Sequence, residues 1–331
     1  MSKTVYENAD VLLGNKDDRY FGNGYKNVIH DIYNVSITDT NVSAFTTIKY
    51  PKSWSRKNTS TDLVPHLSTI DATYIGLQLC EIFLITALVL DDNERNNVFI
   101  KKLKLKSGSL PLENLKEIST ILSYKRNEKE DDEYDTHIFD GVVGNIHFYA
   151  ELETEKFPFI KIGRIQYSDS YIVLGDLSER YYGNLFQRTI QNIENIKLDV
   201  IGVTASADIS ITNDFFERES CYGIDNNFLS DFSPSVIDCI VAIAQLSQVL
   251  IYDIDALDRK KSNTLWMRKI NIDRRRESFE SFHRSHISAN KSIVLKMKDD
   301  NWRIFDMQGS FYNFTFNYSI AHKLPETETN K

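Results

Sequence analysis

The segment Pro65-His-Leu-Ser-Thr-Ile-Asp71 contains the residue types that proton transfer requires. The charge of a histidine such as His66 can change near neutral pH. Asp71 lies near the start of a predicted helix, and Asp238 has the same place in a similar later segment. A carboxylate in a dry pocket can act as a base, and the N–H groups of a helix N-terminus can stabilise an anionic oxygen. We therefore take His66, Asp71 and Asp238 as candidate catalytic residues.

A purely structural interpretation competes with this one for the two aspartates. Ser68-x-x-Asp71 and Ser235-x-x-Asp238 both match the pattern of a helix-capping box. A residue that occurs in both segments is also what a requirement of the fold would produce, so capping and catalysis both stay open for Asp71 and Asp238. His66 has no counterpart in the later segment, which favours a functional role.

Further polar residues near these segments are candidates for binding a substrate. Trp54-Ser-Arg-Lys57 precedes the first predicted helix, and an aromatic ring beside the cations Arg56 and Lys57 suits a sugar or a phosphate-bearing substrate. Gln78 and Gln245 each follow an aspartate by two helical turns and need hydrogen-bond partners if they are buried. They either tie the helix to the sheet or line a ligand tunnel.

The chain contains the same unit twice. Seven of seventeen positions are identical between Arg19-Tyr-Phe-Gly-Asn-Gly-Tyr-Lys-Asn-Val-Ile-His-Asp-Ile-Tyr-Asn-Val35 and Arg180-Tyr-Tyr-Gly-Asn-Leu-Phe-Gln-Arg-Thr-Ile-Gln-Asn-Ile-Glu-Asn-Ile196. Similar matches around the two Ser-x-x-Asp segments and further on follow in the same order. Collinear matches of this kind indicate an internal duplication.

Composition limits the class of protein and its partners. The 331 residues include 41 % hydrophobic residues, which is typical of a globular chain, and the net charge of −8 argues against binding to nucleic acid or to an anionic membrane surface. The two most apolar stretches, 70–90 and 236–257, carry polar groups and are expected as buried helices rather than membrane spans. Three cysteines without metal-ligand spacing, and a start without an apolar signal region, predict a cytoplasmic protein. We expect no metal and no cofactor.

The order of the predicted elements is the same in both halves. An extended β-branched stretch (Val35–Tyr50; Ile196–Thr212) leads through a loop to an apolar helix of about twenty residues, and further strands, among them Ile138–Leu152, follow it. A helix that is hydrophobic on every face must be enclosed. We therefore predict an α+β double hot dog, with units at 1–152 and 179–331 and a crossover at 153–178. Two independent α+β domains are the alternative.

The sequence resembles the AvrD family, the avirulence D proteins known from plant-pathogenic pseudomonads. The resemblance rests on Arg19-Tyr-Phe-Gly-Asn-Gly-Tyr-Lys26, on Tyr50-Pro-Lys-Ser-Trp-Ser-Arg-Lys57 and on Pro65-His-Leu-Ser-Thr-Ile-Asp-Ala72. It implies an enzyme that joins a β-ketoacyl thioester, carried by coenzyme A or an acyl carrier protein, to a pentulose-like sugar or a sugar phosphate. The products would be acyl glycoside signal molecules of the syringolide type.

Two other functions remain open at this stage. One is a double hot-dog dehydratase or thioesterase, although the HxxxGxxxxP pattern of such dehydratases is not met because Arg56 stands where its histidine would be. The other is a non-catalytic protein that binds an acyl ligand. The sequence also leaves a homodimer open.

Overall fold

The computed structural model describes residues 3–56, 63–127, 133–212, 221–229, 234–259, 265–276, 284–297 and 300–324. In the first half it contains β1 (Lys3–Asn8), α1 (Asp10–Leu13), β2 (Ile29–Thr38), β3 (Asn41–Lys49), α2 (Thr69–Leu88), α3 (Asp92–Asn96), β4 (Phe99–Lys106), β5 (Ile118–Asn127), β6 (Asp135–Val143) and β7 (Ile146–Thr154). The second half contains β8 (Arg164–Asp169), α4 (Tyr171–Leu174), β9 (Ile190–Asp199), β10 (Thr204–Thr212), α5 (Val236–Ile254), β11 (Trp266–Arg274), β12 (Arg284–Met297), β13 (Asp300–Phe311) and β14 (Phe314–Lys323).

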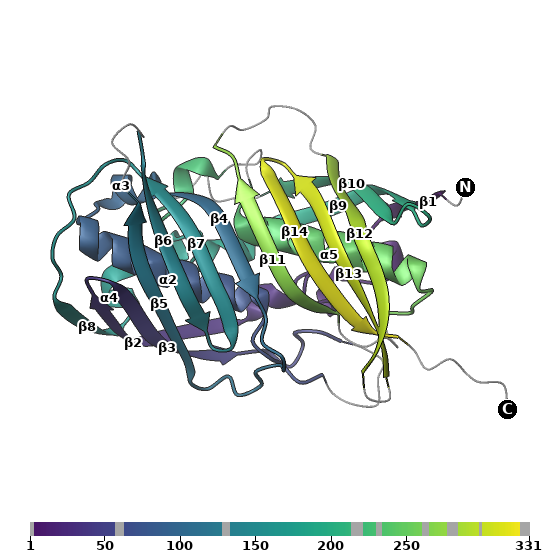
Figure 1. Cartoon of the computed structure of the whole chain (residues 1–331), viewed down its shortest axis with the longest axis horizontal. Helices are drawn as coiled ribbons and strands as arrows, with labels where there is room; N and C mark the ends of the chain where they lie inside the picture. Colours follow the sequence, from purple (N-terminus) through teal and green to yellow (C-terminus); the bar gives the residue numbers. More distant parts are fainter. Residues whose placement is uncertain are drawn as a thin grey trace.

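The described strands form one antiparallel sheet of 14 strands in the order β1-β9-β10-β12-β13-β14-β11-β4-β7-β6-β5-β3-β2-β8. Read from either end, this order passes through equivalent strands of the two units, so the duplication is visible in the topology. β4 and β11 pair in the middle and join the two half-sheets into one (Figure 1). The structure therefore has the continuous sheet of a double hot dog rather than two independent domains.

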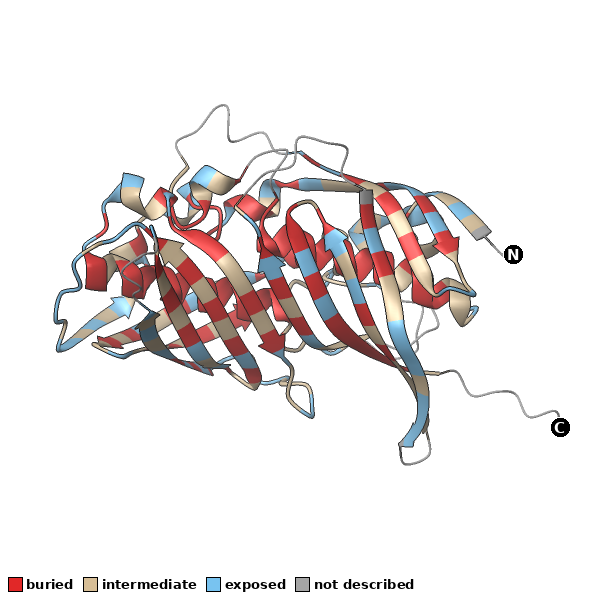
Figure 2. Ribbon diagram, turned by 45° about the horizontal axis from the view of Figure 1, so that its top comes forward, coloured by how far each residue is buried: buried red, intermediate tan, exposed pale blue. Residues whose placement is uncertain are grey.

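The two long helices begin where the sequence predicts. Ser68 caps α2 and Ser235 caps α5, each in a complete capping box with the aspartate three residues later. Both helices are long and apolar enough to span a membrane, but 89 % and 83 % of their most apolar windows are buried inside the protein. The sheet curves around them, and the strands bury alternate residues against them (Figure 2). These enclosed helices confirm the predicted hot-dog arrangement.

Close packing between helix and sheet depends on a glycine. A Cβ atom on Gly76 of α2 would lie 2.2 Å from the ring of Phe148 on β7. No side chain fits there without moving the helix away from the sheet. Gly76 therefore lets α2 lie directly against the strand.

Three expected extended runs are broken by turns, which corrects the prediction. Val35–Tyr50 falls on the β2–β3 hairpin, Ile138–Leu152 on the β6–β7 hairpin and Ile196–Thr212 on the β9–β10 hairpin. In the second hairpin, Gly144 has a φ of 57°, a left-handed conformation that suits glycine. β-branched residues on both sides of a short turn read as one strand in the sequence, because the turn itself is only a few residues long.

The first strand of each unit pairs with the other unit. β1 pairs with β9, and β8 pairs with β2. The stretch 153–178, expected as a crossover, thus contains β8 and α4 as the counterparts of β1 and α1. Because each unit completes the sheet edge of its neighbour, the two halves are interlocked.

Candidate functional site

A cluster of hydroxyl groups lies at the start of α2. The Tyr20 hydroxyl is 2.6 Å from Ser68 Oγ and 3.4 Å from the Tyr50 hydroxyl. Tyr50 donates a hydrogen bond to Asp71 Oδ2, and its oxygen also lies 3.3 Å from the backbone carbonyl oxygen of His66. Residues from three separate segments therefore meet around one helix N-terminus.

Asp71 is the buried acceptor of this cluster. Its Oδ1 lies 2.7 Å from Nε2 of His30, and its Oδ2 accepts the backbone N–H of Ser68 at 2.8 Å. Burial acts to raise the pKa of Asp71, but the hydrogen bonds from His30, Tyr50 and Ser68 outweigh it and lower the pKa. An ionised carboxylate can only accept hydrogen bonds, so the proton in the contact with His30 sits on Nε2.

The two tyrosines act as hydrogen-bond donors. Burial, together with the negative charge of Asp71, raises the pKa of Tyr20 and of Tyr50 well above 10. Both hydroxyl groups therefore keep their protons at neutral pH. The Tyr50 proton is directed to Asp71, whereas the Tyr20 hydroxyl can direct its proton to a substrate oxygen and stabilise negative charge there.

A pocket of about 130 Å³ opens beside the hydroxyl cluster, between the two units. One part of its wall is apolar and comes from both units: Leu63, Leu67, Leu110, Leu112, Leu265 and Met267. The polar part includes the hydroxyl cluster and several charged or amide side chains: Tyr20, Tyr50, Ser68, Arg19, Gln248 and Arg259. Such a lining suits a ligand with an apolar chain and a polar, oxygen-rich head.

Two of the predicted site residues line this pocket. The Trp54 ring packs edge to face against Tyr20 and Tyr50, with ring centroids 5.6 and 5.3 Å apart. His66 is half-buried, and its Nδ1 lies 3.4 Å from the carbonyl oxygen of Val64. Because a carbonyl only accepts, Nδ1 carries the proton in that contact, and Nε2 of the neutral ring can accept one.

The other two predicted residues of this loop are Arg56 and Lys57. Arg56 is exposed and forms an ion pair with Asp18 at 3.5 Å, so its side chain points away from the pocket wall. Lys57 lies outside the described residues.

Gln78 and Gln245 tie each helix to the opposite unit. Gln78 Nε2 donates to the backbone carbonyl oxygen of Tyr182 at 2.9 Å. Gln245 Oε1 accepts from Arg19 at 3.0 Å, and its Nε2 donates to Gln191 at 3.3 Å. Neither glutamine lines the pocket beside the hydroxyl cluster, although Gln245 lines a second cavity of about 150 Å³. Their observed contacts are those of structural ties.

Comparison with known proteins gives the chain a family. Residues 4–325 match the family described as Pseudomonas avirulence D protein (AvrD). The chain belongs to the AvrD family. No curated protein matches the sequence.

Solved structures similar to this AvrD-family protein have low sequence identity. An acyl-CoA thioesterase II from Mycobacterium marinum is 9 % identical, with 80 % of this chain and 92 % of that chain covered and a TM-score of 0.34. A trans-AT PKS dehydratase domain from Brevibacillus brevis is 8 % identical, with 88 % and 97 % covered and a TM-score of 0.36. We assign the fold from the sheet topology and the enclosed helices.

Asp238 occupies the equivalent position in the second unit, in different surroundings. Its Oδ2 accepts from the Tyr181 hydroxyl at 2.6 Å and from the backbone N–H and side chain of Ser235. No histidine takes the place of His30, because Gln191 stands there. Burial raises the pKa of Asp238, and its hydrogen bonds offset only part of this effect. Asp238 does not line the pocket beside the hydroxyl cluster.

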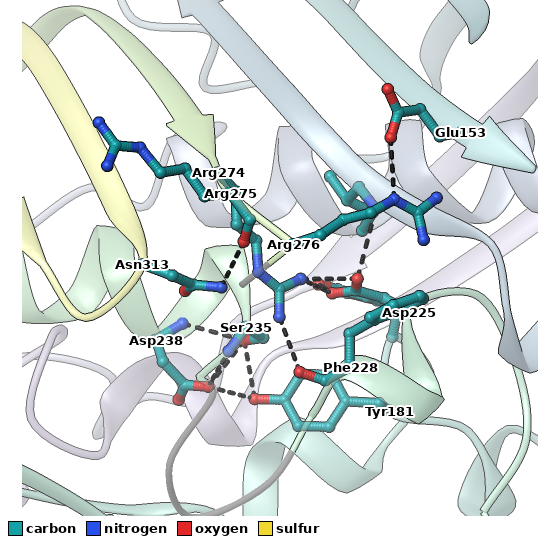
Figure 3. A network of polar contacts seen from close by, with 12 residues as sticks. Glu153, Tyr181, Asp225, Phe228, Ser235, Asp238, Arg274, Arg275, Arg276 and Asn313 are labelled. Atoms are coloured by element: carbon teal, nitrogen blue, oxygen red, sulfur yellow. Dashed lines mark hydrogen bonds and ion pairs between the residues drawn. The ribbon is translucent and has the colours of Figure 1, made fainter. Parts of the chain in front are cut away.

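In the second unit of this AvrD-family protein, the described residues 221–229 pack against positions equivalent to the wall of this pocket. Asp225 forms a fully buried ion pair with Arg274 at 2.6 Å (Figure 3). It also accepts a hydrogen bond from the Tyr182 hydroxyl at 3.1 Å. The backbone of this segment also bonds to a counterpart of the pocket wall. The N–H of Asp225 donates to the carbonyl oxygen of Val98, which is equivalent to Leu265 of the wall, at 2.6 Å. We call the first unit, with the pocket beside its hydroxyl cluster, the open unit, and the second, where residues 221–229 pack at the equivalent place, the closed unit.

Sequence reasoning missed several residues of the open site. Tyr20 is part of the repeated Arg-Tyr motif, and its recurrence as Tyr181 was a usable signal. His30 differs from its counterpart Gln191, as His66 differs from its own, and this asymmetry was also visible. Arg259 and Tyr50 carried no local signal, because only the tertiary structure brings them to the pocket.

Proposed function

We propose that this AvrD-family protein is a biosynthetic enzyme that joins a β-ketoacyl thioester to a pentulose-like sugar in the pocket between its units. One observation carries the proposal: the hydroxyls of Tyr20, Tyr50 and Ser68 cluster over the buried carboxylate of Asp71 at the end of a partly apolar pocket. Family membership supports a biosynthetic role. The cysteine content supports a cytoplasmic location.

The first step is acyl transfer. A sugar hydroxyl attacks the thioester carbonyl carbon, so that a C–O bond forms, the C–S bond breaks and the thiol leaves with the proton that the hydroxyl loses. Negative charge develops on the carbonyl oxygen in the transition state. Tyr20, which stays protonated, donates a hydrogen bond to this oxygen, while Tyr50 keeps its single proton directed to Asp71.

His66 transfers the proton from the sugar hydroxyl to the leaving thiolate. Its Nδ1 is directed to the Val64 carbonyl, and its Nε2 accepts the hydroxyl proton and delivers it to the leaving thiolate. The same nitrogen then removes an acidic proton from the carbon between the two carbonyl groups of the β-ketoacyl ester. That carbon attacks the sugar ketone in an aldol-type ring closure, and the ketone oxygen takes up a proton.

Asp71 positions neighbouring groups and does not itself transfer a proton. It is fully buried, and its oxygens are already engaged by His30, Tyr50 and Ser68. Its charge fixes the Tyr50 hydroxyl and completes the helix cap. Capping and support of the reaction are therefore compatible roles for one residue.

Mass spectrometry of the purified protein with a β-ketoacyl thioester and a pentulose tests the proposal. The expected product is the acyl sugar or its cyclised form, together with free thiol. Free thiol with a free β-keto acid would instead indicate a thioesterase, and loss of water from a β-hydroxyacyl thioester would indicate a dehydratase. Binding of the thioester without any conversion would leave only the ligand-binding alternative.

A further inference from the structure

Three arginine side chains line the pocket, and none of the described lining residues is an aspartate or a glutamate. They are Arg19 from the first unit and Arg259 and Arg268 from the second. The net charge of the whole protein is nevertheless −8. The pocket is therefore a positively charged region on an acidic molecule.

Arg19 is the most deeply buried of the three. It is 3 % exposed, and in the part of the chain that the structure describes its Nε has no hydrogen-bond partner. Burial lowers the pKa of Arg19 to about 10; the charge of Asp10 opposes this effect, and the positive charge of Arg259 adds to it. Arg19 forms an ion pair with Asp10, which lines the second cavity and not this pocket. Arg259 donates to the backbone carbonyl oxygens of Asp18 and Arg56. Two cations thus lie near each other at the pocket wall.

The closed unit provides an internal comparison. There Arg180, the counterpart of Arg19, forms a buried ion pair with Glu81 at 2.7 Å. The residue equivalent to Glu81 on α5 is Gln248, which is neutral and lines the open pocket. In the closed unit a helix carboxylate therefore pairs with the arginine, whereas in the open unit the helix position carries an amide and the carboxylate partner of Arg19 is Asp10, outside the pocket.

We propose that the open pocket binds a phosphate group of its ligand, with Arg19 and Arg259 as the cations and Gln248 as a neutral hydrogen-bonding neighbour. The placement of the ligand rests on the proposed function. The planar guanidinium group matches phosphate oxygens with paired hydrogen bonds. The phosphate belongs either to a sugar phosphate acceptor or to the phosphopantetheine arm of the acyl donor.

Calorimetric titration of the full chain distinguishes these sources. A pentulose phosphate is compared with the same pentulose, and phosphopantetheine with pantetheine. In one pair the phosphorylated member should bind at least about tenfold more tightly, and its affinity should fall as salt is added. The pair that shows the difference identifies the source. Equal affinities within both pairs would overturn the proposal.

Gln248→Glu copies the closed unit into the open pocket. Its carboxylate should compete with the phosphate and weaken binding of the phosphorylated ligand at least about tenfold, with little effect on the unphosphorylated one. Gln166→Glu makes the same chemical change on the exposed face of β8 and is the matched control. Arg259→Gln should weaken binding of the phosphorylated ligand in the same way. Melting temperatures establish that each variant is folded.

Product formation is measured separately. A phosphate preference without product would overturn the proposed reaction and leave the phosphate site. A second outcome would overturn the phosphate site alone. In it, product forms from unphosphorylated substrates, and Gln248→Glu binds both members of each pair as tightly as the wild type does.

Discussion

Nε2 of His30 lies 2.7 Å from Oδ1 of Asp71, and this pair distinguishes the open unit from the closed one. In the closed unit, Gln191 replaces the histidine, and its amide donates to the backbone carbonyl oxygen of Asp238 at 3.1 Å instead. The pKa of Asp71, beside the histidine, is lowered, and the pKa of Asp238, beside the glutamine, is raised. One side-chain difference thus accompanies opposite charge preferences at equivalent positions.

His30→Gln should make the open unit resemble the closed one. Loss of a hydrogen bond to a charged group should lower the free energy of unfolding at pH 7 by about 2 kcal/mol. Because the pKa of Asp71 is lowered in the folded protein, its contribution exists above the unfolded pKa and is lost as the pH falls through the folded value. The variant should therefore lose less stability in acid than the wild type. Urea unfolding at neutral and acidic pH measures both effects.

The reciprocal change Gln191→His is the control for this experiment. It alters the closed unit and should leave product formation unchanged. Equal stability of His30→Gln and the wild type at pH 7 would show that the contact with Asp71 contributes nothing.

Tyr20→Phe should lower the rate of product formation about 10²–10³-fold, because it removes the donor to the developing oxyanion. Tyr50→Phe should lower the rate less, because it removes the hydrogen bond to Asp71 instead. The rings remain, so packing against Trp54 is kept. Tyr33→Phe removes a hydroxyl from β2 away from the pocket and should retain wild-type activity. Single-turnover kinetics provide the measurement, and wild-type rates in both pocket variants would exclude the hydroxyl cluster from the reaction.

His66→Ala should lose about 10²–10⁴-fold in rate, as expected for removal of a general base. His66 is half-buried and caps no helix, so the melting temperature should change little. Asp238→Asn, in contrast, lies outside the pocket and should keep most of the rate. If Asp238→Asn abolished product formation while His66→Ala did not, the reaction would have to be assigned to the other unit.

His137 should make the protein less stable in mild acid. Burial lowers its pKa from 6.5 to about 4, and Arg126 adds to the effect. The stability that depends on the neutral ring is present above pH 6.5 and is lost as the pH falls toward 4, by up to about 3 kcal/mol. His137→Gln removes this titration, so its unfolding free energy should fall less between pH 7 and pH 4. Identical pH profiles of variant and wild type would contradict the assignment.

Asp225→Asn should destabilise the protein by about 3–5 kcal/mol, because it leaves the buried charge of Arg274 without its carboxylate. The double variant Asp225→Asn with Arg274→Met should recover part of this loss, since no unpaired charge remains. Urea denaturation of the single and double variants gives the coupling energy. A single variant as stable as the wild type would mean that the ion pair does not hold segment 221–229 in place.

The sequence by itself determined the repeated unit, both long helices and their capping boxes. These features depend on local patterns: Ser-x-x-Asp at a helix start and an apolar surface on every face of the helix. It also pointed to His66 and Trp54, since neither recurs in the second unit. The hairpins at Gly144 and between β2 and β3 were hidden because short turns hardly interrupt a β-branched run.

Only the tertiary structure decided which unit is open. Ser68-x-x-Asp71 and Ser235-x-x-Asp238 are locally alike, so no local pattern separates the two aspartates. Their difference comes from strand pairing and loop packing, which bring His30 and Tyr50 to Asp71. The same packing places residues 221–229 against the equivalent positions of the second unit. Contacts between residues far apart in the chain depend on the whole sheet, and the physical character of the site follows from those contacts.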